Sequence, residues 1–144
     1  MNWKTEATEK LRRYEAMRQA LHNIPEELAR LDAQIHSPRA VRTDSISVRG
    51  GAGPEDALLN SIVCRQELRW SLEQAQSWVR TTERALSVLL PEEKLILQQL
   101  YISPRADALS WLCSRLQLEQ SSIYRRRDKA LRSFTIALYG AEGS

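Results

Sequence analysis

The spacing of the apolar residues constrains this chain most, because along two long stretches they follow each other by threes, fours and sevens. In the first stretch, residues 3–36, they are Tyr14, Met17, Leu21, Ile24, Leu28, Leu31 and Ile35. In the second, residues 55–89, they are Leu58, Leu68, Leu72, Ala75, Val79, Leu86 and Leu89. Residues at this spacing share one face of an α-helix. Each stretch is therefore expected to be an amphipathic helix with one face to bury.

The first stretch contains a candidate break at the sequence HNIPEE. Asn23 is a common helix-capping residue, and Pro25 suits the first turn of a helix. Glu26 stands three residues after Asn23, which is the spacing of a capping box. These residues predict two helices that meet at a kink near Asn23.

Residues 37–54 separate the two stretches and are rich in residues that end helices. Pro38, Gly50, Gly51, Gly53 and Pro54 favour turns, and so do the serines and the threonine between them. We expect a loop here that joins two antiparallel helices. The two apolar faces can cover each other in a coiled-coil-like hairpin, and the same pattern equally permits a homodimer.

The composition also favours helices, since the 144 residues include only five glycines and five prolines. At LLPEEK, Pro91 ends the long helix and begins another. Three shorter helices are expected, over residues 92–102, 105–116 and 120–138. The predicted fold class is all-α, with a long helical hairpin in residues 1–89 and a three-helix unit in residues 90–144.

The two last helices carry the apolar spacing of a helix-turn-helix. That motif needs a small residue in its first helix, an apolar residue in the turn, and an apolar anchor about five positions later. Cys113, Leu118 and Ile123 stand at these positions, and Leu112 and Leu116 flank the small residue. The spacing predicts that Ile123 points into the core.

If Ile123 is buried, the polar residues of the last helix face outward. A helix in the major groove presents its first turns to base edges, where Gln pairs with adenine and Arg with guanine. The predicted base-reading residues are Gln120, Ser121, Tyr124 and Arg125. The predicted phosphate contacts are Arg126, Arg127, Lys129 and Arg132. Residues 120–134 hold five basic residues and one acidic residue, although the whole chain carries only +3. A solvated helix face with ion pairs is the alternative interpretation.

No catalytic, metal-binding or cofactor-binding residues are expected, so the chain is interpreted as a non-enzyme. His22 and His36 do not stand at metal-ligand spacing with Cys, Asp or Glu, and no nucleotide-binding glycine motif occurs. Cys64 and Cys113 are expected to be reduced thiols. No apolar run approaches the roughly 18 residues that a membrane span needs, and the N-terminus lacks an apolar signal core. We expect a cytoplasmic protein of a bacterial host cell.

The segments LLPEEKLILQQLY and WLCSRLQLEQSSIYRRRDKALRSF together resemble region 4 of sigma-70-type factors. The resemblance covers residues 89–138, and the layout of the N-terminal half is similar to small phage and prophage regulators of the ArpU and RinA kind. It implies a DNA-binding activator of late genes, with double-stranded DNA and RNA polymerase as partners. The chain departs from the pattern at Gln117, where glycine usually supplies a left-handed backbone, and at Arg126, where an apolar residue is common.

Two other functions fit the same pattern. A recognition subunit for phage DNA packaging, similar to a small terminase, also joins a helix-turn-helix to long oligomerising helices. A protein-interaction module would use the three-helix unit to bind polymerase or another protein without binding DNA.

Overall fold

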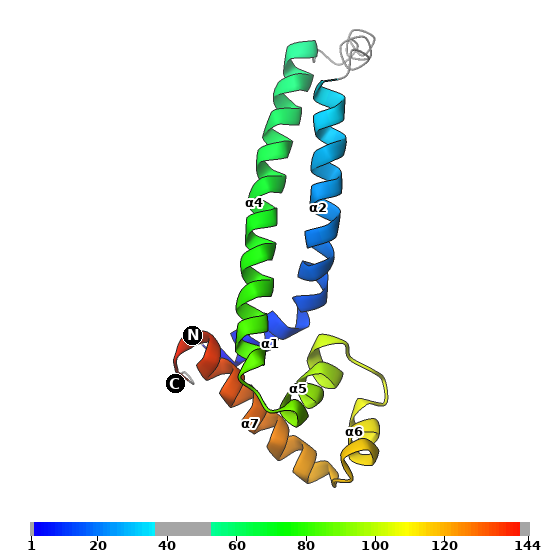
Figure 1. Ribbon diagram of the computed structural model, residues 1–144, viewed down its shortest axis with the longest axis vertical. Helices are drawn as coiled ribbons and strands as arrows, with labels where there is room; N and C mark the ends of the chain where they lie inside the picture. Colours follow the sequence, from blue (N-terminus) through cyan, green and yellow to red (C-terminus); the bar gives the residue numbers. More distant parts are fainter. Residues whose placement is uncertain (1, 37–52, 142–144) are drawn as a thin grey trace. The chain divides into compact units, whose positions relative to one another are not determined.

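The computed structural model describes residues 2–36 and 53–141, and all regular structure in these residues is helical (Figure 1). The predicted all-α class is therefore confirmed. The elements are α1 (Trp3–Arg12), α2 (Tyr14–Ile35), α4 (Pro54–Ser87), α5 (Pro91–Leu97), the π-helical turn η2 (Gln98–Ile102), α6 (Ala108–Leu116) and α7 (Gln120–Tyr139). Most of the predicted loop, residues 37–52, lies outside the described residues.

The break in the N-terminal stretch lies at Arg13, so the predicted break near Asn23 is wrong. Helix α2 runs without interruption through Asn23 and Pro25. Pro25 lacks an N–H group and costs the helix one hydrogen bond, to the carbonyl of Leu21. Because Pro25 is exposed, water can solvate that carbonyl, and the helix continues. Asn2 is the residue that caps a helix, since its Oδ1 accepts the N–H groups of Lys4 and Thr5 at 3.1 and 3.2 Å.

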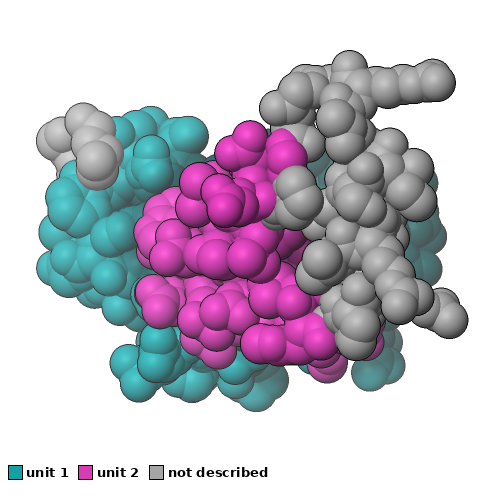
Figure 2. Space-filling model, turned by 90° about the horizontal axis from the view of Figure 1, so that it is seen from above, with its two compact units in different colours: residues 1–18, 77–144 teal, residues 19–76 magenta. Residues whose placement is uncertain are grey.

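The chain forms two compact units whose boundaries lie inside α2 and α4 (Figure 2). Unit 1 comprises residues 1–18 and 77–144, and unit 2 comprises residues 19–76. The sequence placed the division at residue 89 instead. The difference arises because α1 packs on α7, so the N-terminus belongs with the C-terminal helices.

Unit 1 has a closed apolar core. Ile96, Leu112 and Ile123 are fully buried together, one each from α5, α6 and α7. Farther along α7, Phe134 is also fully buried, as is Leu11 on α1. Both α1 and α5 pack directly on α7, which is therefore the central helix of this unit.

Unit 2 consists of the larger parts of α2 and α4, which run side by side in opposite directions (Figure 1). An ion pair links them, with Arg65 Nη1 lying 2.6 Å from Asp32 Oδ1. Leu31 on α2 and Ala75 on α4 are buried, but Trp70 is 63% exposed. The two helices therefore cover only part of each other's apolar surface.

Candidate nucleic-acid interface

The turn between α6 and α7 fixes the start of the candidate interface. Gln117 adopts the left-handed conformation, with φ 53° and ψ 49°, although it is not glycine. Such a conformation costs an L-residue about 1–2 kcal/mol. The Leu118 N–H donates to the carbonyl of Cys113 at 3.1 Å, which closes the end of α6. A left-handed backbone is the conformation that was expected at this position of the turn.

Ile123 anchors α7, as its spacing predicted. Its side chain is fully buried with Ile96 and Leu112, and Leu118 in the turn packs against the same cluster. The carbonyl of Glu119 accepts the Ile123 N–H at 3.1 Å, so the first turn of α7 is regular from its start. Because Ile123 is buried, residues about half a helical turn away from it on α7 face the solvent.

The four predicted base-reading residues lie on the exposed surface of the first two turns of α7. Gln120, Ser121 and Arg125 are exposed, and Tyr124 is 41% exposed. The Arg125 guanidinium makes one hydrogen bond, to Ser122 Oγ at 3.3 Å. Among the described residues it has no ion pair, so its donors remain accessible to a ligand.

The four predicted phosphate-contacting residues differ in how they are held. Arg126 is ion-paired with Glu92 of α5, and so is tied back to the protein. Arg127 donates to Asp128 Oδ1 at 3.0 Å, and its Cζ lies 4.8 Å from the centroid of the Tyr124 ring. Lys129 and Arg132 are exposed. Lys129, which has no ion pair among the described residues, is therefore better placed than Arg126 to meet an external anion.

A small hollow of about 270 Å³ lies beside Arg126 and Lys129, at the start of α5. Glu93 also lines it, and its Oε1 accepts the backbone N–H of Leu90 at 3.0 Å. Its Oε2 is buried without a hydrogen-bond partner among the described residues. Glu93 fixes the entry into α5, the helix that carries Glu92 and so holds Arg126.

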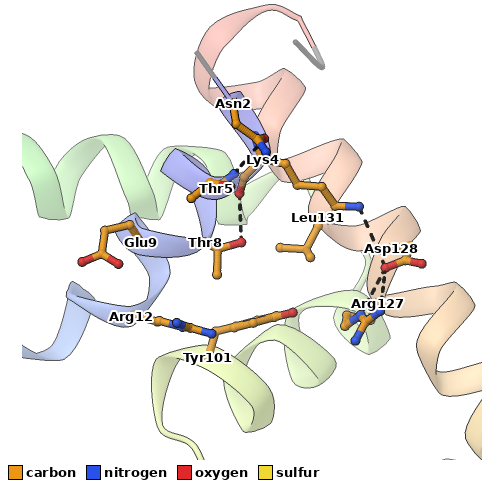
Figure 3. Close-up of a pocket in the computed structure, with 10 residues that line it drawn as sticks. All are labelled: Asn2, Lys4, Thr5, Thr8, Glu9, Arg12, Tyr101, Arg127, Asp128 and Leu131. Carbon is orange, nitrogen blue, oxygen red and sulfur yellow. Dashed lines mark hydrogen bonds and ion pairs between the residues drawn. The ribbon is translucent and has the colours of Figure 1, made fainter. Parts of the chain in front are cut away.

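A second group of polar residues, which sequence reasoning missed, comes from α1. Lys4, Thr8 and Arg12 follow each other at intervals of four and line a groove of about 450 Å³ (Figure 3). Arg127 and Asp128 of α7 line the same groove. We call it the α1–α7 groove. The interval of four residues was the available signal, because it places polar side chains on one helix face.

Two tyrosines of unit 1, Tyr14 and Tyr139, have a raised pKa, and neither belongs to the predicted DNA-contacting residues. Burial, followed by a hydrogen bond to the Glu83 carboxylate at 2.6 Å and by its negative charge, raises the pKa of Tyr14 to about 12. Burial and the nearby charge of Glu6 raise the pKa of Tyr139. Tyr139 also meets the Trp3 ring edge-on, with the centroids 4.8 Å apart. Both tyrosines fasten α1 and the start of α2 to the rest of unit 1.

Within residues 2–36 and 53–141, no three His, Cys, Asp or Glu side chains gather in a way that could hold a metal ion. Cys64 and Cys113 are free thiols. In the same part of the chain, no helix has the length and apolar character needed to span a membrane.

Comparisons of the chain with protein-family models, with curated proteins and with solved structures found no match.

Proposed function

We propose that this chain is a sequence-specific DNA-binding regulator of transcription, in which α7 enters the major groove. The resemblance to sigma region 4 and to phage regulators of the ArpU and RinA kind suggests activation of late genes, with RNA polymerase as a further partner. The observation that carries the proposal is the rotation of α7. Ile123 is fully buried while Tyr124 and Arg125, the next two residues, are exposed.

The charge on the same helix supports this function. Arg125 and Lys129 are exposed and have no ion pair among the described residues, and Arg132 is exposed beyond them. Lys129 and Arg132 follow Arg125 at intervals of four and three residues, where they can contact phosphates that border the groove while Arg125 reaches the base edges. Binding that depends on such contacts should weaken steeply with salt, because each contact releases counterions.

The test is selection of bound duplexes from a random DNA pool at two salt concentrations. We expect an enriched sequence at both. Arg125→Ala should relax the preference at one or two base pairs and cost about 1–3 kcal/mol of binding free energy. Lys129→Ala should weaken binding to all sequences about equally, because a phosphate contact carries no sequence information.

The assignment of roles fails if the two variants change base preference to the same extent. Absence of any bound duplex at low salt would contradict DNA binding itself. That outcome would favour the protein-interaction module, in which the three-helix unit binds polymerase or another protein.

A second candidate function is supported by unit 2. Leu59, Val63 and Trp70 of α4 are 58, 43 and 63% exposed and lie near one helix face, which is typical of a surface that another chain covers. A recognition subunit for phage DNA packaging would use such a surface to assemble a ring. Native mass spectrometry separates a ring from the monomer or dimer expected of a regulator.

A further inference from the structure

The α1–α7 groove combines charged side chains from two helices that are distant in sequence (Figure 3). Its cations are Lys4 and Arg12 on α1 and Arg127 on α7. Two carboxylates, those of Glu9 and Asp128, also line it. Cations therefore outnumber carboxylates in the groove by one.

Both carboxylates already have partners. Glu9 accepts from Arg13 Nε at 2.7 Å, and Asp128 lies 3.0 Å from Arg127 Nη2 and 4.0 Å from Lys4 Nζ. Arg12 has no ion pair among the described residues, and its Cζ lies 5.7 Å from the centroid of the Tyr101 ring. The ring restricts the guanidinium without using its hydrogen-bond donors. A planar group with free donors is well suited to a phosphate oxygen.

The position of the groove indicates which phosphate it meets. Arg127 and Asp128 lie one helical turn beyond Tyr124 along α7, so the groove opens beside the C-terminal end of the base-reading residues. DNA backbone follows the edges of a helix seated in the major groove. We propose that the α1–α7 groove binds a backbone phosphate of the duplex that α7 reads, with Lys4 and Arg12 as its contacts. This inference rests on the proposed function and adds α1 to the DNA-binding surface.

The test measures how the binding of one selected duplex depends on salt, with the full chain. Lys4→Gln and Arg12→Gln should each reduce the slope of log K against log salt by up to about 0.9, which is the value for the one phosphate that both residues contact. Neither variant should change the preferred base sequence. Arg12→Lys keeps the charge and should retain most of the slope.

Arg18→Gln is the matched control. It removes the same charge from another arginine of unit 1 that lies over a tyrosine ring, with its Cζ 5.8 Å from the centroid of Tyr14, but Arg18 does not line the groove. Its slope should equal that of the wild type. Circular dichroism should show the same helix content for all variants, since Lys4, Arg12 and Arg18 are exposed.

The possible results separate the two proposals. If the wild type binds no duplex at low salt, the proposed function fails. If the wild type binds but Lys4→Gln and Arg12→Gln behave as Arg18→Gln does, only the groove assignment fails. If inorganic phosphate binds the wild type but not Arg12→Gln, while both variants keep the wild-type salt slope with DNA, the groove takes the free ion instead of the DNA backbone.

Discussion

Units 1 and 2 are both built from amphipathic helices, but only unit 1 encloses its apolar residues. In unit 1, Ile96, Leu112, Ile123 and Phe134 are all fully buried. Among the described residues of unit 2, only Leu31 and Ala75 are buried to a comparable degree. Two helices can cover one face of each other, whereas helices from three directions can surround a core. The difference indicates that unit 1 supplies most of the free energy of unfolding.

The largest expected loss in the free energy of unfolding comes from truncating a side chain in the closed core. Leu112→Ala should lower the free energy of unfolding by about 3–4 kcal/mol, because a fully buried leucine leaves a cavity. Leu68→Ala, at a half-buried position of unit 2, should cost about 1 kcal/mol, because solvent already reaches the site. Denaturant unfolding followed by circular dichroism measures both. Equal losses would contradict the comparison.

The sequence predicted the elements of both units better than the contacts between them. Apolar periodicity placed α4 within two residues of its ends, and the turn spacing placed Ile123 in the core. These properties depend on neighbouring residues. The packing of α1 on α7 depends on residues more than a hundred positions apart, such as Trp3 and Tyr139, and no periodicity within one helix reports it.

In the candidate site too, the sequence predicted what depends on neighbouring residues and missed the contacts between helices. Exposure of Arg125 follows from burial of Ile123 two residues earlier, so local geometry was sufficient to predict it. The ion pair between Arg126 and Glu92 joins α7 to α5, and the sequence did not predict it. The break at Arg13 was missed because the sequence around Pro25 carries a stronger local signal. An exposed proline costs one hydrogen bond, and favourable residues on both sides can outweigh that cost.

An intermediate loss in the free energy of unfolding is expected at alkaline pH, and it should come from a residue of unit 1. The pKa of Tyr14 is raised to about 12 in the folded chain, compared with about 10 when it is unfolded. The neutral phenol is therefore favoured by folding. This stabilisation is complete below pH 10 and is lost as the pH rises from 10 to 12, by up to about 3 kcal/mol.

Tyr14→Phe isolates this contribution. The difference in the free energy of unfolding between the wild type and Tyr14→Phe should shrink as the pH rises from 10 to 12. Tyr124→Phe alters an exposed phenol and serves as the control. Unit 2 contains no tyrosine. If Tyr14→Phe loses as much stability as the wild type between pH 10 and 12, the titrating group is not Tyr14.

The smallest expected loss of stability is at Trp70, the most exposed large apolar side chain among the described residues of unit 2. A side chain that is 63% exposed contributes little to the folding of a monomer, so Trp70→Ala should change the free energy of unfolding by no more than about 0.5 kcal/mol. Denaturant unfolding at two protein concentrations tests this expectation. A loss above about 1 kcal/mol that grows with protein concentration would show that another chain covers Trp70 in solution, because association stabilises a protein by mass action. Unit 2 would then complete its core by assembly, and the contrast with unit 1 would be between a core closed within one chain and a core shared by two.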